Sequence, residues 1–74
     1  MPQLRDPFAI ATLAENVRKH RIAKDLSQEA LANFAGIEYS QVSRIERGII
    51  NTSVSVIFAL AKALDITPSQ LLEF

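Results

Sequence analysis

Apolar residues recur at intervals of three and four along most of this chain, and this spacing limits the fold more than any other feature of the sequence. It is clearest at Ile10, Leu13, Ala14 and Val17, and it returns between residues 54 and 64. Such spacing places one stripe of apolar side chains along each helix. No stretch alternates apolar and polar residues as a half-buried strand would. The sequence therefore predicts an all-α fold.

Capping signals divide the chain into five short helices. Asp6 before Pro7, Ser27 and Ser53 are N-cap residues, and TPSQ at 67–70 is a capping box with proline at the first helical position. Gly36 is expected to end the second helix as a left-handed residue. The helices are expected at about 7–24, 28–35, from after residue 38 to residue 48, 54–64, and from 68 to the end of the chain. The inward-facing residues are expected to be Ile10, Leu13, Ala14, Val17, Arg21, Leu31, Ala32, Phe34, Val42, Ile45, Val54, Ile57, Phe58, Ala61 and Leu64.

The length of 74 residues leaves room for a single domain, at residues 1–74, with a modest core. The chain has no cysteine, so neither a disulfide nor a thiolate metal site can support that core. Association with a second copy is the remaining route to added stability. No apolar run is long enough to span a bilayer and no secretory signal is visible, so we expect a soluble, cytoplasmic protein without a membrane partner.

Charge is balanced overall but unevenly placed. A net charge of zero argues against a strongly basic nucleic-acid binder, because lysine and arginine supply the affinity for phosphates. Seven of the eight basic residues nevertheless lie between Arg5 and Arg47, and four of them lie within 18–24. From Gly48 onward the chain has one basic residue, Lys62, and two acidic residues, Asp65 and Glu73. One end of the chain is therefore basic and the other is apolar.

The most informative segment is QEALANFAGIEYSQVSRIER, at residues 28–47. It contains two short helices and a turn of about three residues with a glycine, a geometry that lets the second helix project into a major groove. The segment resembles the phage repressor and Cro (XRE-type) helix-turn-helix family. The resemblance runs from about residue 13 to residue 72 and rests on LSQEALA, AGI, SRIERG and, later, ALAKALDI. It implies a five-helix lambda-repressor-like DNA-binding domain, with the helix-turn-helix at about 28–47.

The same resemblance assigns roles at a DNA interface. It implies that Ser27 and Gln28 bind phosphate at the start of the second helix, where free amides also favour an anion; alternatively, Ser27 only caps and Gln28 is solvated. The outward face of the third helix is expected to read bases, or else to be a polar solvent face. The expected base-reading residues are Tyr39, Ser40, Gln41 and Arg44, and the further phosphate contacts are Ser43, Arg47 and Asn51.

Four other positions carry open alternatives. Arg21 and Glu46 match a partly buried ion pair of the family that positions the third helix, although they could be two separate surface charges. Glu38 either accepts from a cytosine amino group or caps its helix away from DNA. His20, the only histidine, is interpreted as a core-edge residue. The loop residues Ile49 and Ile50, where relatives are often basic, pack either against a neighbour or under the fourth helix.

The apolar C-terminal end predicts a homodimer. The family commonly dimerises there, and the expected interface residues are Ile66, Leu71, Leu72 and Phe74. The alternative is that these side chains only close the core of the monomer. A two-fold dimer would set its recognition helices about 34 Å apart and require a roughly palindromic operator in double-stranded DNA.

These observations predict a transcriptional regulator, either a repressor or an autoregulator. Phage repressors, restriction-modification controllers and antitoxins all include such small proteins. The second hypothesis is a protein-interaction module that keeps the fold but binds DNA weakly or not at all. With no cysteine, one histidine and no clustered carboxylates, the chain offers no nucleophile, base or metal set for an enzyme. No cofactor, metal or small-molecule ligand is expected.

Overall fold

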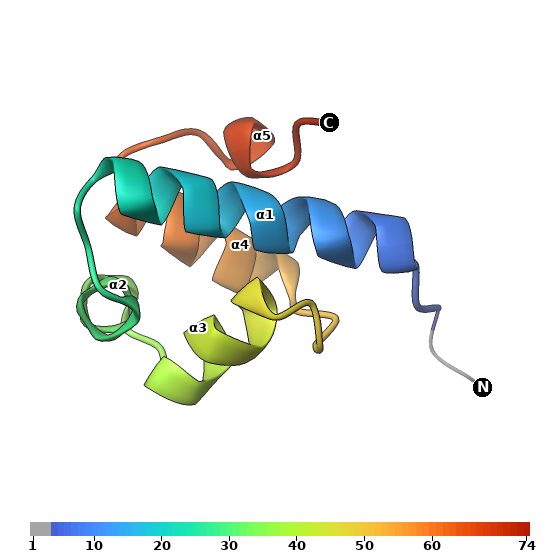
Figure 1. Ribbon diagram of the computed structural model, residues 1–74, viewed down its shortest axis with the longest axis horizontal. Helices are drawn as coiled ribbons and strands as arrows, with labels where there is room; N and C mark the ends of the chain where they lie inside the picture. The colour runs from blue at the N-terminus through green and yellow to red at the C-terminus, as the bar shows by residue number, and fades with distance from the viewer. Residues whose placement is uncertain (1–3) are drawn as a thin grey trace.

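The computed structural model describes residues 4–74, and this part of the chain contains five α-helices and no strand. The helices are α1 (Pro7–Ala23), α2 (Gln28–Ala35), α3 (Tyr39–Glu46), α4 (Val54–Ala63) and α5 (Pro68–Leu71). In Figure 1, α1 crosses the molecule, with α5 on one side of it and α2 and α3 on the other, while α4 lies behind. The predicted all-α, five-helix fold is confirmed. None of these helices is both long and apolar enough to cross a membrane.

Local capping chemistry sets the helix starts. The Asp6 side chain accepts hydrogen bonds from the backbone amides of Phe8 and Ala9, and Ser53 accepts one from the amide of Val56. Thr67 forms the predicted capping box with Gln70. Each cap satisfies backbone donors that the first turn of a helix leaves without a partner.

Two helix ends use aspartate where glycine is more usual. Asp25 after α1 and Asp65 after α4 have φ angles of 57° and 56°. This left-handed conformation is one that aspartate tolerates better than most residues, because its short side chain can hydrogen-bond locally. The two positions explain why α1 stops at Ala23 and α4 stops at Ala63 without a glycine at either end.

The core draws fully buried side chains from every helix. Val17 comes from α1, Leu31 from α2, Leu60 from α4 and Leu71 from α5, and none of them has exposed surface. Burying a side chain of this size contributes about 1.5–3 kcal/mol. Val42 and Ile45 of α3 complete this set, so α3 is fixed by its apolar face while its other face stays outside.

Three of the expected inward residues are exposed, and these expectations are corrected. Phe34 and Val54 are 69% exposed and Phe58 is 59% exposed. In α2 the inward face is set by Leu31 and Ala32, and a residue two positions after Ala32 points away because successive residues turn by about 100°. The same geometry turns Phe58 away, because it lies two positions before the fully buried Leu60. Since α4 is apolar on almost all sides, its periodicity alone did not decide which face is buried.

One polar side chain lies in the core and holds the C-terminus. Asn16 of α1 is 6% exposed, and its Nδ2 donates to the carbonyl oxygens of Leu71 at 2.9 Å and Glu73 at 2.8 Å. Both amide hydrogens are therefore used, and the residues after α5 are tied to α1. Just beyond these two hydrogen bonds, the ring of Phe74 lies against the ring of Phe8. The ring centroids are 5.2 Å apart and the planes are at 83°, which is an edge-to-face contact.

Candidate nucleic-acid interface

The turn between α2 and α3 gives the two helices their relative orientation. Gly36 has a φ of 72°, and the amide of Ile37 donates to the carbonyl of Ala32 at 3.1 Å, which closes the end of α2. A side chain at residue 36 would meet no atom within 4 Å, so the requirement for glycine comes from the backbone angle. The chain then enters α3 after only Ile37 and Glu38.

The outer face of α3 carries the residues expected to read DNA. Tyr39, Ser40 and Arg44 are exposed, and Gln41 is half-buried. Within residues 4–74 no hydrogen bond or ion pair involves any of these four side chains, so they remain available to a ligand. The face is adjacent to Val42 and Ile45, which are buried and rigidly packed. Figure 1 shows α3 along the edge of the molecule opposite α5.

Ser43 of α3 and Arg47, the C-cap residue that follows the helix, are two further residues expected to contact phosphate. Ser43 is half-buried, and its backbone carbonyl accepts a long bond of 3.4 Å from Arg47 Nε, within the same turn. Arg47 itself is exposed. That bond leaves the two terminal nitrogens of the guanidinium free to face an anion, a geometry that arginine uses for phosphates.

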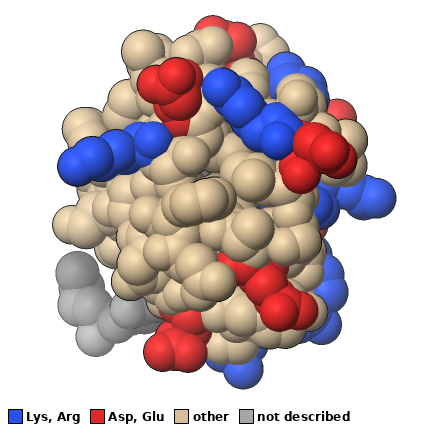
Figure 2. All heavy atoms as spheres, turned by 90° about the vertical axis from the view of Figure 1, so that its left-hand side faces the viewer, with Lys and Arg blue, Asp and Glu red and all other residues tan. Residues whose placement is uncertain are grey.

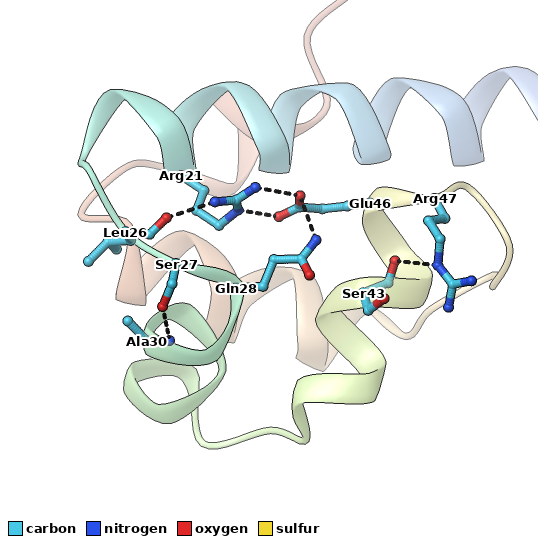
Figure 3. Close-up of polar contacts among 8 residues, drawn as sticks. All are labelled: Arg21, Leu26, Ser27, Gln28, Ala30, Ser43, Glu46 and Arg47. Carbon is cyan, nitrogen blue, oxygen red and sulfur yellow. Dashed lines mark hydrogen bonds and ion pairs between the residues drawn. The ribbon is translucent and has the colours of Figure 1, made fainter.

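A polar network joins α1, α2 and α3 behind this face (Figure 3). Arg21 donates from Nε to Glu46 Oε2 at 2.7 Å and from Nη2 to Glu46 Oε1 at 3.0 Å. Its Nη1 donates to the carbonyl of Leu26 at 2.7 Å. The side chains of Arg21 and Glu46 are only 15% and 3% exposed, so they are not two separate surface charges. The hydrogen bond to Glu46 raises the pKa of Arg21 against the opposing effect of burial, and the guanidinium stays charged.

The network also includes the first residue of α2. Gln28 Nε2 donates to Glu46 Oε1 at 3.1 Å, a contact that the sequence did not indicate. Ser27 uses its hydroxyl oxygen to cap the amide of Ala30 at 3.0 Å. What remains at this helix start for an anion is the hydroxyl hydrogen of Ser27, the second hydrogen of Gln28 Nε2 and the backbone amides of Gln28 and Glu29. The phosphate role of Ser27 and Gln28 thus rests on these groups and stays a prediction.

The structure shows the surroundings of the other positions that the sequence singled out. Glu38 occupies the N-cap position, but its carboxylate makes no capping hydrogen bond and it is exposed. Ile50 packs on the core, whereas Ile49 is 46% exposed. Asn51 is engaged within the chain, because its Nδ2 donates to the carbonyl of Leu4 at 2.9 Å. His20 is half-buried, and its position at the core edge stays a prediction.

The expected dimer residues divide into two groups. Leu71 is fully buried in its own chain and Ile66 packs on the same core, so these two close the monomer, and Leu71 offers no surface to a partner. Leu72 and Phe74 are 47% and 97% exposed. Phe8 of α1, which sequence reasoning missed, joins them at 60% exposure. Phe8 was missed because only the tertiary contact with Phe74 brings the two ends of the chain together.

The side of the molecule on which α2 lies has no continuous basic surface among the described residues. Figure 2 shows the side on which α2 lies, where lysine, arginine, aspartate and glutamate side chains surround a broad uncharged area. Intermixed signs do not produce the long-range positive potential of a strongly basic DNA binder. On this side, the described residues therefore offer no broad positive field for a polyanion.

The arrangement of α2, a glycine turn and an exposed α3 is that of a helix-turn-helix. Residues 17–71 match the model of the helix-turn-helix family HTH_3. The chain belongs to this family. Its members are DNA-binding regulators of transcription and not enzymes.

Relatives and solved structures agree with this assignment. The chain is 42% identical over 60 residues to the control protein C.SmaI of Serratia marcescens, a match covering 81% of this chain and 71% of the relative. It is 39% identical over 61 residues to the control protein C.BamHI of Bacillus amyloliquefaciens, covering 81% and 75%. The structure superposes on the restriction-modification controller protein C.AhdI of Aeromonas hydrophila with a TM-score of 0.81 and 44% identity, over 84% of this chain and 94% of that one.

Proposed function

We propose that two copies of this protein bind a palindromic operator in double-stranded DNA and control transcription from a nearby promoter. The observation that carries the proposal is the free outer face of α3, whose buried face is fixed by Val42 and Ile45 while Tyr39, Ser40 and Arg44 stay exposed. A rigid helix with exposed donors can enter a major groove without rearranging. Its guanidinium can then make a bidentate contact with guanine.

The network behind α3 supports the same function. Arg21, Glu46 and Gln28 connect three helices through charged hydrogen bonds, which are about twice as strong as neutral ones. They hold α3 at a fixed angle to α2. A fixed angle matters because base contacts require donors to be placed within a few tenths of an ångström.

The second copy would dock on the apolar surface formed by Phe8, Leu72 and Phe74. Together with Asp6, Ala9 and Thr12 these residues line an open groove of about 360 Å³. A phenylalanine that is 97% exposed loses unfavourable contact with water when a copy of the same surface covers it. Dimerisation here also adds apolar burial to a domain with a small core.

The role in the cell is best described as a repressor or autoregulator that responds to its own concentration. Two relatives that match over 81% of the chain are control proteins, and one solved structure that resembles it is a restriction-modification controller. The match covers 94% of the controller C.AhdI, so the two chains are of comparable length. We therefore place it among small controllers whose dose is the signal.

A second function has one observation in its favour. An open groove of about 590 Å³ is lined by residues of α2 and α4, namely Phe34, Ala35, Ala59, Lys62 and Ala63. An apolar groove with a single cation is the kind of surface that a protein partner covers. If DNA binding fails, a protein-interaction role at this groove becomes the better explanation.

Selection from a random pool of duplexes tests the proposal. We expect enrichment of a two-fold symmetric sequence with half-sites about one helical turn apart, and binding that weakens steeply as salt rises. Arg44→Ala should lose the preference at one base in each half-site, while Lys62→Ala, which removes a cation from α4, serves as the control. Absence of any duplex binding at low salt would exclude this function.

A further inference from the structure

The loop that follows the recognition helix has no cation of its own. Residues 48–53 are Gly, Ile, Ile, Asn, Thr and Ser. The amide of Ile49 donates to the carbonyl of Arg44 at 3.0 Å, so the loop continues directly from the last turn of α3. A helix inserted in a major groove lies between two phosphate backbones, and the segment at its end is close to one of them. The loop is therefore placed near phosphates but lacks the residues that neutralise them.

The residues before α1 are attached to this loop by two crossed hydrogen bonds. Arg5 Nη2 donates to the carbonyl of Ile49 at 2.5 Å, and Asn51 Nδ2 donates to the carbonyl of Leu4 at 2.9 Å. The partners are 44 and 47 residues apart in the sequence. Figure 1 shows the start of the described chain leaving α1 toward the side of the loop after α3. The chain thus delivers a cation from its N-terminal segment to the end of the recognition helix.

The guanidinium of Arg5 is free to bind a further group. Arginine has five N–H donors, and the contact with Ile49 uses only Nη2. The residue is exposed, and within residues 4–74 it forms no ion pair. The neighbouring carboxylate of Asp6 is committed to capping α1 through the amides of Phe8 and Ala9. The remaining donors form the planar fork that matches a phosphate.

We propose that Arg5 binds a DNA phosphate beside the loop after α3, and that Asn51 positions the N-terminal segment for this contact. This inference rests on DNA binding by α3 and adds a residue that no sequence pattern indicated. It also changes the role expected for Asn51, because the side-chain amide of that residue holds Leu4. The cation that the loop lacks is supplied by Arg5.

The salt dependence of binding to one selected duplex tests the role of Arg5. Each phosphate contact that is lost reduces the slope of log K against log salt by about 0.9. Arg5→Gln should reduce the slope by about this amount for each protomer bound, and it should weaken all duplex sequences alike. Arg5→Lys keeps the charge and should keep the slope. Lys62→Gln removes an exposed cation from α4 and should leave the slope unchanged.

A double-mutant cycle tests the role of Asn51. In the Asn51→Ala background the N-terminal segment is no longer held, so Arg5→Gln should then change the slope and the affinity by less than in the wild type. Thermal unfolding of each variant checks that the domain remains folded. If Arg5→Gln binds the duplex with the affinity and the salt slope of the wild type, the proposal is overturned and the contact with Ile49 is purely structural. If the wild-type protein binds no duplex at all, the function on which the proposal rests is refuted instead.

Discussion

Removing the carboxylate of Glu46 should destabilise the domain far more than removing any exposed acid. Glu46 is 3% exposed and accepts three hydrogen bonds, two from Arg21 and one from Gln28. Glu46→Ala leaves the Arg21 guanidinium, which is 15% exposed, without its counter-charge. Breaking a buried pair in this way costs about 3–5 kcal/mol, and the residual access of Arg21 to water favours the lower end.

The expected loss of about 3 kcal/mol is large for a domain of this size. Each kcal/mol lowers the Tm of a 60–100-residue domain by about 4–8 °C, so the Tm should fall by more than about 10 °C. The assay is thermal and urea unfolding followed by circular dichroism at one fixed protein concentration, since the proposed dimerisation would make Tm depend on concentration. Glu46→Gln keeps one carbonyl acceptor and should cost less, about 1.5–3 kcal/mol.

Two further variants make the test specific to the ion pair. Glu15 is an exposed acid on α1, and Glu15→Ala should change the stability by less than about 0.5 kcal/mol. Replacing both partners, with Arg21→Met and Glu46→Leu, leaves no unpaired charge and should be less damaging than Glu46→Ala alone. A cost below about 1 kcal/mol for Glu46→Ala would refute the interpretation of a buried network that fixes α3.

Four other substitutions test the remaining parts of the account. Arg44→Ala should weaken operator binding by about 1–3 kcal/mol and relax the preference at one base, whereas Arg47→Ala, at an expected phosphate contact outside the Glu46 network, should weaken all duplexes alike; equal, sequence-independent losses in titrations would contradict these roles. Asn16→Leu removes one buried and one part-buried hydrogen bond to backbone carbonyls and should cost about 2 kcal/mol in urea unfolding, and an unchanged midpoint would show that the C-terminal tail is held by other contacts. Phe74→Ser should raise the dimer dissociation constant at least about tenfold by sedimentation equilibrium, because burying such a ring contributes about 1.5–3 kcal/mol; no change in association would place the dimer surface elsewhere.

The helix boundaries were predictable because they depend on local chemistry. Asp6, Ser27, Ser53 and Thr67 each cap the helix that follows them, as expected from residue type and position alone. Gly36 has the predicted left-handed angle. These features involve bonds between residues close in sequence, so a sequence pattern contains the information that decides them.

The buried faces were less predictable. The sequence VSVIFALAKA of α4 is apolar on several sides, so more than one stripe satisfies the helical spacing. Packing against α2 and α5 selects the face of Leu60 and leaves Phe58 and Val54 outside. Phe34 was misplaced for a related reason: it follows Leu31 by three residues and so satisfies the helical spacing, although the packing of α2 leaves it 69% exposed.

The site shows the same division between local and tertiary information. The exposed face of α3 follows from its own sequence, because Val42 and Ile45 fix which side is buried. The contacts of Gln28 with Glu46 and of Asn51 with Leu4 join segments 18 and 47 residues apart. No spacing rule relates such positions, so only the folded arrangement of the helices shows them.

The central claim is that the outer face of α3 enters the major groove, and protection of guanine N7 from dimethyl sulfate on the selected operator tests it most directly. N7 lies in the major groove, where the expected Arg44 contact would shield it. The account predicts two clusters of protected guanines about 10 base pairs apart, with protection at one position in each cluster lost in Arg44→Ala. Saturating binding that leaves every guanine N7 reactive, or that protects only minor-groove adenine N3, would contradict it.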